Sequence, residues 1–165
     1  MRVREIMEKN PITFRPTDTL HKALTTFTDK GISGAPVVSK GKLVGIVSEL
    51  DIIKVLDIYT PRVHFSSMPQ FFLVLAGLKS KKKTTELRKR ITEASKISVE
   101  EFMTREVISV AADADIMEAT RMIDTYRVNR LPVVDRGRVV GILTRDDIIK
   151  AVAKLDGELC AAGKR

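Results

Sequence analysis

The sequence is poor in the residues that build disulfides and metal centres. It holds one cysteine, Cys160, and two histidines, His21 and His64, which lie far apart in the chain. A single cysteine excludes an intramolecular disulfide, and without cysteine or histidine partners it cannot form the usual zinc site. We therefore expect neither a disulfide-stabilised protein nor a metal centre.

Long hydrophobic runs are also lacking. The longest, FFLVLAGL at Phe71–Leu78, is far shorter than the roughly 20 residues that cross a bilayer. The opening MRVREIMEKN alternates charged and apolar residues and has no apolar core of a secretory signal. We expect a soluble, cytoplasmic protein that does not enter a membrane.

Patterns typical of enzymes are not found either. The sequence has no nucleophile–base constellation, no ligands at metal spacing and no glycine-rich phosphate loop of the GxxxxGK type. We expect that the protein is not an enzyme and that it requires no cofactor.

Positive charge is abundant but concentrated. The formal net charge is +8, and Lys79–Arg90 holds seven basic residues and one acidic residue, which leaves about +2 for the rest of the chain. A nucleic-acid-binding regulator would have to use this basic segment. The segment contains no aromatic residue to stack on bases, so a solvated helix, a dimer contact or an acidic protein partner stay open beside nucleic acid.

The chain contains an internal duplication. Residues 5–56 align without a gap to residues 101–152, and 15 of the 52 positions are identical. The identities include PVV at Pro36–Val38 and Pro132–Val134, and DIIK at Asp51–Lys54 and Asp147–Lys150. A repeat of this kind fixes the architecture before any single element is considered.

Each copy predicts the element order β-α-β-β-α. Short strands at Ile12–Phe14 and Ile108–Val110 precede a helix with apolar residues at i, i+3, i+4 and i+7. Two strands joined by a glycine turn follow, and then a second helix. One such unit buries too little alone, so we predict a mixed α/β (α+β) fold in which two repeats pack with pseudo-twofold symmetry and leave clefts between them.

The predicted organisation has four parts. They are repeat 1 at 1–56, an inserted linker at 57–96, repeat 2 at 97–156 and a C-terminal tail at 157–165. The linker contains the apolar stretch and the basic segment, and inserts of this length are usually functional or disordered. If exposed, the apolar stretch would mark an interaction surface.

The stretches GIVSELD and GILTRDD occupy equivalent places in the two copies. As a purely structural feature, Ser48 or Thr144 is a helix N-cap and Asp51 or Asp147 completes a capping box. As a functional feature, the helix N-terminus with its hydroxyl holds a phosphate, and the aspartate accepts bonds from ribose hydroxyls.

Two details favour the functional interpretation. Gly45 and Gly141 interrupt aliphatic strands, as expected where a ligand or another backbone comes close. In addition, a capping box is described with Glu or Gln at its third helical position, whereas both copies carry Asp.

The repeated PVV, turn glycine and Gly-aliphatic-aliphatic-Ser/Thr-x-x-Asp pattern resembles a tandem pair of CBS domains, named after cystathionine β-synthase. The resemblance implies a stand-alone regulatory module that binds AMP, ADP, ATP or S-adenosylmethionine in the clefts and signals to an unknown protein partner in trans. It also implies a homodimer. A purely structural dimerisation module remains an alternative.

The resemblance assigns ligand-binding roles residue by residue. Ser48 and Thr144 resemble hydroxyls that hold ribose or phosphate, and Asp51 and Asp147 resemble the ribose-binding acids. The segments that resemble the lining of the adenine pocket are Ile12 with Ile32, Ser33 and Gly34, and Ile108 with Val128, Asn129 and Arg130.

The two copies differ where Gly34 aligns with Arg130. A guanidinium pairs with phosphate and a glycine cannot, so we predict two unequal sites. A solvated surface arginine is the alternative for Arg130.

Overall fold

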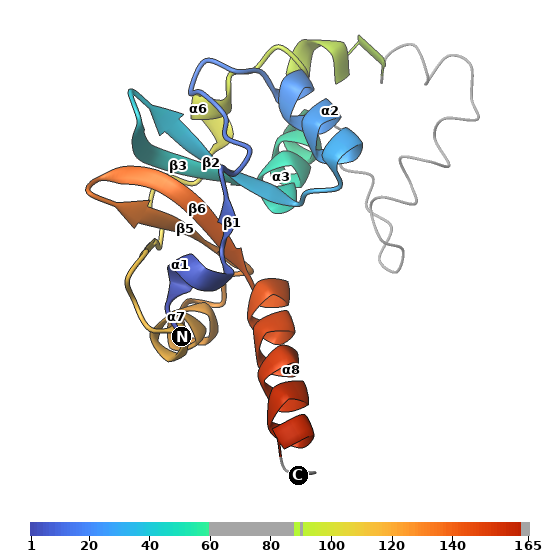
Figure 1. Ribbon diagram of the computed structural model, residues 1–165. Helices are drawn as coiled ribbons and strands as arrows, with labels where there is room; N and C mark the ends of the chain where they lie inside the picture. The colour runs from blue at the N-terminus through green and yellow to red at the C-terminus, as the bar shows by residue number, and fades with distance from the viewer. Residues whose placement is uncertain (60–87, 90, 163–165) are drawn as a thin grey trace, which may run out of the picture. The chain divides into compact units, whose positions relative to one another are not determined.

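The computed structural model describes residues 1–59, 88–89 and 91–162 (Figure 1). The strands are β1 (Glu8–Lys9), β2 (Gly34–Ser39), β3 (Lys42–Ser48), β4 (Val110–Ala111), β5 (Arg130–Asp135) and β6 (Arg138–Thr144). The helices are α1 (Val3–Ile6), α2 (Leu20–Lys30), α3 (Glu49–Tyr59), α6 (Val99–Phe102), α7 (Ile116–Tyr126) and α8 (Arg145–Ala162).

The duplication is reproduced element by element. Helix α2, strands β2 and β3 and the start of α3 each lie 96 residues before α7, β5, β6 and the start of α8. The mixed α+β class and the predicted helix–strand–strand–helix order are therefore confirmed.

The predicted first strands are confirmed only in part. In the second copy β4 (Val110–Ala111) shares Val110 with the predicted Ile108–Val110, and in the first copy Phe14 is a β-bridge residue within the predicted Ile12–Phe14. Strand β1 (Glu8–Lys9) is a further short strand that the sequence pattern does not predict. The reason is long-range pairing: β1 pairs antiparallel with β6, and β4 pairs parallel with β5. These partners are distant in the sequence, so the local hydrophobic pattern does not predict where the short strands begin and end.

The linker predictions fall almost entirely outside the described residues. This applies to the apolar stretch Phe71–Leu78 and to most of the basic segment Lys79–Arg90. Of that segment the structure describes Arg88 and Lys89, and both are exposed.

The helix ends and hairpin turns of the two repeats adopt the same left-handed backbone conformations. Gly31 ends α2 in the left-handed conformation with φ 63°, and Arg127 takes the equivalent place after α7 with φ 54°. The turns Lys40–Gly41 and Arg136–Gly137 both have positive φ at both residues, as tight hairpins require.

The described chain divides into two compact units that cross the repeat boundary. Unit 1 comprises Met1–Thr13, Ala35–Ile46 and Arg105–Arg165, and unit 2 comprises Phe14–Gly34 and Val47–Thr104. The segment leading into the first repeat thus belongs with the second, and the segment leading into the second belongs with the first.

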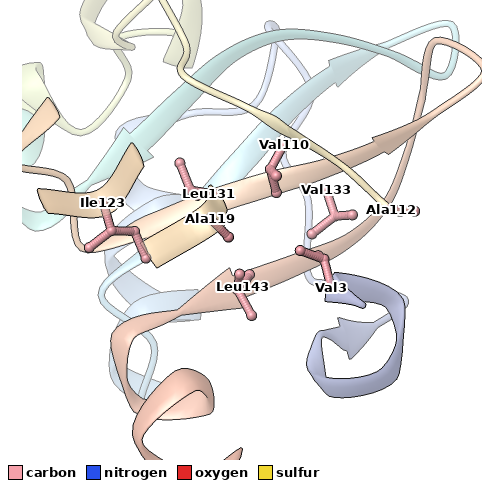
Figure 2. Packing of buried hydrophobic residues seen from close by; sticks show 8 residues of the cluster. All are labelled: Val3, Val110, Ala112, Ala119, Ile123, Leu131, Val133 and Leu143. Atoms are coloured by element: carbon pink, nitrogen blue, oxygen red, sulfur yellow. The ribbon is translucent and has the colours of Figure 1, made fainter. Parts of the chain in front are cut away.

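Unit 1 is built on a four-stranded sheet of order β1-β6-β5-β4, with β5 antiparallel to β6. The leading segment joins it through backbone bonds from Val3 N to Ala114 O (3.0 Å) and from Arg4 N to Ala112 O (2.9 Å). Figure 2 shows the core, where side chains from α1, the strands and α7 gather. Its fully buried cluster is Val3, Val110, Ala112, Ala119, Ile123, Leu131, Val133 and Leu143.

Unit 2 packs around α2. The rings of Phe14 and Phe27 lie 5.9 Å apart, and Leu20 and Ala23 complete the buried face of the helix. The segment leading into the second repeat is attached here, because Val99 N donates to the Asp18 carbonyl at 2.7 Å.

The side chain of Asp18 makes local bonds at the start of α2. Its carboxylate accepts from Arg15 N and from Lys22 Nζ, each at 2.8 Å. Burial raises the pKa of Asp18, but these hydrogen bonds and the positive charge of Lys22 outweigh that effect and lower it below the ordinary value.

None of the helices in the described part of the chain is both long and apolar enough to span a bilayer.

Candidate functional site

Strand β3 ends at Ser48 and α3 begins at Glu49, so the first motif lies at a strand-to-helix junction. The backbone N–H of Ser48 donates to Asp51 Oδ2 at 2.8 Å, and the Ser48 hydroxyl donates to the same oxygen at 2.6 Å. The other oxygen, Oδ1, accepts from the Thr104 hydroxyl at 3.0 Å. Asp51 is only 6% exposed, and this network compensates its burial.

The second motif repeats this geometry at the junction of β6 and α8. Thr144 N and the Thr144 hydroxyl donate to Asp147 Oδ2 at 2.8 and 2.6 Å. In return, Asp147 N donates to Thr144 Oγ1 at 3.2 Å, so a complete capping box is present. Asp147 is half-buried.

Of the two details that favoured function over capping, the aspartates have a structural explanation, and so does one of the two glycines, Gly141. Aspartate makes the capping-box bonds despite its shorter side chain, so its presence does not argue against a cap. A side chain at Gly141 would collide with Met7 and with the Glu8 carbonyl, so this glycine admits strand β1. For Gly141, the approach of another backbone is the explanation that holds.

A backbone bond ties each motif to the start of the preceding hairpin. Glu49 N donates to the Ser33 carbonyl and Arg145 N donates to the Asn129 carbonyl, both at 3.2 Å. The first N–H groups of α3 and α8 are therefore held beside Ser33 and Asn129. These are two of the residues predicted to line the ligand site.

The predicted site residues divide between the two units. Unit 2 brings together Ile32, Ser33, Gly34, Ser48 and Asp51. Unit 1 contains Ile12, Ile108, Val128, Asn129, Arg130, Thr144 and Asp147. Ile12 thus belongs to a different unit from the motif of its own repeat.

Gly34 is the first residue of β2 and Arg130 is the first residue of the equivalent strand β5. The alignment of these two residues is the basis for the prediction of unequal sites. Gly34 is buried and Arg130 is half-buried. The role of Arg130 toward phosphate stays a prediction. The alternative of a solvated surface arginine at position 130 also stays open, since burial of this degree leaves part of the residue exposed.

Two residues beside the motifs were not among the predicted site residues. Thr104 contacts Asp51, and the Arg145 guanidinium donates from Nε to the Val128 carbonyl at 3.2 Å. Thr104 aligns with Glu8 and Arg145 with Glu49, so both are places where the repeats differ in chemistry. That divergence is the signal that could have identified them.

Next to the second motif, Asp146 forms an ion pair with Lys150 Nζ at 2.6 Å, one turn along α8. The hydrogen bond and the negative charge of Asp146 raise the pKa of Lys150. Both side chains are largely exposed, so the pair adds little to stability.

A separate pocket of about 400 Å³ lies within unit 1. Lys42 and Arg105 supply positive charge and Ser109 a hydroxyl, and the other lining residues are Leu43, Val44, Val107, Val134 and Gly137. None of the predicted site residues lines it. Among the described residues, no three His, Cys, Asp or Glu side chains gather as a metal site would require.

Comparison with known family models, sequences and structures identifies proteins that contain CBS domains. The CBS domain family model matches residues 3–58 and 99–154. The uncharacterized protein MJ1426 of Methanocaldococcus jannaschii is 36% identical over 154 residues, which cover 92% of this chain and 91% of that protein. By contrast, the chain spans only 14% of the A-adding tRNA nucleotidyltransferase of Aquifex aeolicus, at 28% identity over 92% of this chain.

Among solved structures, CBSX2 in complex with AMP matches with a TM-score of 0.68 at 26% identity, covering 94% of this chain and 98% of that one. The CBS domain pair of MJ0100 in complex with 5-methylthioadenosine and S-adenosyl-L-methionine matches with a TM-score of 0.66 at 27% identity, covering 93% and 97%.

Proposed function

Because this chain belongs to the CBS-domain family, as a tandem pair, we propose that it is a regulatory module for an adenosine-containing ligand. The candidates are AMP, ADP, ATP and S-adenosylmethionine, bound at the Ser48/Asp51 and Thr144/Asp147 motifs. The observation that carries the proposal is the repeated hydroxyl–aspartate pair at the N-terminus of a long helix. The proposal is supported by two structurally similar proteins that were solved with such ligands, CBSX2 with AMP and the CBS domain pair of MJ0100 with 5-methylthioadenosine and S-adenosyl-L-methionine.

The chemistry of the motif suits a nucleoside. The aspartate accepts hydrogen bonds from the 2′ and 3′ hydroxyls of a ribose, as acidic residues do in dinucleotide-binding folds. The hydroxyl of Ser48 or Thr144 donates to that aspartate and keeps acceptor capacity for a ribose hydroxyl. The positive end of the helix dipole favours a phosphate, although the first N–H of each helix already donates to the Ser33 or Asn129 carbonyl.

The remaining predicted residues would form the adenine pocket. Apolar side chains stack against a base, and the carbonyls and N–H groups at the hairpin starts read its edge. These residues are Ile12, Ile32, Ser33, Gly34, Ile108, Val128, Asn129 and Arg130. The guanidinium of Arg130 adds a phosphate partner that Gly34 cannot supply, which makes the two sites unequal.

The output of such a module is a shift between conformations rather than turnover. We propose no catalytic role. The ligand changes the population of states only as far as its affinity for them differs, and a protein partner in trans reads the change.

The proposed module is a homodimer. Helix α8 exposes Ile149 (67%), Val152 (55%) and Leu155 (40%), and α3 exposes Leu50 (59%) and Ile53 (58%). Large apolar side chains repeated along a helix favour association through that face. Sedimentation at micromolar concentration tests this, and a monomeric protein would contradict it.

A thermal-shift screen tests the ligand proposal. AMP, ADP, ATP, NAD and S-adenosylmethionine are added at saturating concentration to the wild type, Asp51→Ala and Asp147→Ala, each compared with its own ligand-free midpoint. A ligand at 100 times its Kd stabilises the folded state by about 2.7 kcal/mol, which a melting curve resolves. We expect a shift with at least one compound and its loss in a variant. No shift with any of them would leave the structural dimerisation module as the better account.

A further inference from the structure

The two motif aspartates differ in how much of their hydrogen-bonding capacity is already used. A carboxylate has about four acceptor positions, two on each oxygen. Asp51 Oδ2 accepts two bonds from Ser48, and Oδ1 accepts one from Thr104. One position on Oδ1 is left, and the residue is only 6% exposed.

Asp147 uses only one of its two oxygens in this way. Thr144 donates twice to Oδ2, while within the described residues no side chain donates to Oδ1. As a residue, Asp147 is half-buried, whereas Asp51 is buried. Within the described residues, side-chain hydrogen bonds leave both acceptor positions on Asp147 Oδ1 unused.

The difference originates outside the motifs. Thr104 follows α6 in the segment that leads into the second repeat and belongs to unit 2 with Asp51. The equivalent position in the leading segment of the first repeat is Glu8, which belongs to unit 1 with Asp147. A glutamate has no hydroxyl like that of Thr104 to donate to a neighbouring carboxylate.

A ribose presents two neighbouring hydroxyls as donors. At Asp147 both can bond to Oδ1 without breaking a protein bond. At Asp51 the second hydroxyl has to displace Thr104, which loses a hydrogen bond to a charged group. We propose that Thr104 is a specificity-determining residue that weakens ribose binding at Asp51 and makes Asp147 the preferred ribose acceptor.

This inference rests on the proposed function and is tested with AMP by calorimetry. Asp147→Ala serves as the background, so that the heat reports the Asp51 motif alone. Thr104→Val removes the hydroxyl at nearly constant shape, and Thr104→Ser keeps it as the matched control. We expect about tenfold tighter AMP binding in Thr104→Val and little change in Thr104→Ser, because one hydrogen bond to a charged group no longer competes.

A second probe separates this effect from a general change in the fold. With 2′,3′-dideoxyadenosine monophosphate, which lacks both ribose hydroxyls, Thr104→Val should give no gain. If the Asp147→Ala background does not fold, Thr104→Val in the otherwise unaltered chain must tighten the weaker of the two AMP-binding steps.

The outcomes are distinguishable. AMP binding that is unchanged or weaker in Thr104→Val overturns the inference and leaves the proposed function intact. An equal gain with the dideoxy probe also overturns it, because the hydroxyl would then not compete with ribose. No binding of AMP to the wild type or to any variant overturns the inference, and the proposed function falls with it only if none of the other adenosine compounds shifts the melting midpoint either.

Discussion

Replacing the two motif aspartates should affect stability unequally. Asp51→Ala removes the acceptor of three hydrogen bonds at a site that is 6% exposed. Loss of a cap costs about 1 kcal/mol, and loss of further bonds to a charged group costs about 1.5–3 kcal/mol. Relief from burying a charge offsets part of this, so we expect a net loss of about 3 kcal/mol.

Asp147→Ala removes a half-buried cap and should cost only about 1 kcal/mol. For a chain of this size, 1 kcal/mol corresponds to about 2–4 °C in Tm. The expected decreases are therefore about 6–12 °C for Asp51→Ala and about 2–4 °C for Asp147→Ala. Urea unfolding followed by circular dichroism and melting curves measure both.

Thr104→Val is the internal control, because it removes one of the three bonds and leaves the carboxylate in place. It should cost about 1.5–3 kcal/mol, because the lost hydrogen bond is to a charged group. Equal losses for the two aspartate variants, or a larger loss for Asp147→Ala, would refute the claim that Asp51 is the more structural of the two.

Two other predictions concern sites away from the motifs. The pKa of Asp18 is lowered in the folded state, so its contribution to stability is fully present above its unfolded pKa and is lost as the pH falls through the lower folded value. In Asp18→Asn, the free energy of unfolding should therefore decrease less steeply with falling pH in this range. An unchanged pH dependence would contradict the role of the bonds to Arg15 and Lys22. Arg127→Gly should stabilise the protein by about 1 kcal/mol in urea unfolding, because φ 54° is strained for arginine but not for glycine, the residue at the equivalent position 31 of the first repeat. A loss of stability would show that the Arg127 side chain contributes more than the strain costs.

Much of the fold could be predicted because the information is local and present twice. The stripe of Leu20, Ala23, Leu24 and Phe27 predicts α2; Leu24 is half-buried and the other three are buried. The glycine turns at Gly41 and Gly137 predict the hairpins and adopt the required positive φ. Agreement between two copies turns weak local patterns into a definite prediction.

The rest depends on partners that are distant in the sequence. Strand β1 consists only of Glu8–Lys9 and forms by pairing with β6, so no local periodicity in the sequence predicts it. The contact between Thr104 and Asp51 joins residues 53 positions apart. The motif itself could be predicted, but how much of each carboxylate remains open to a ligand could not.

The exchange of leading segments between the repeats bears on how the chain arose. Each compact unit is completed by a segment that precedes the other repeat, so a single repeat could not close its own core. An ancestor with one repeat would meet this requirement only as a pair of chains that traded their N-terminal segments. Duplication within one gene would join such a pair covalently and would allow positions such as Glu8 and Thr104 to diverge independently.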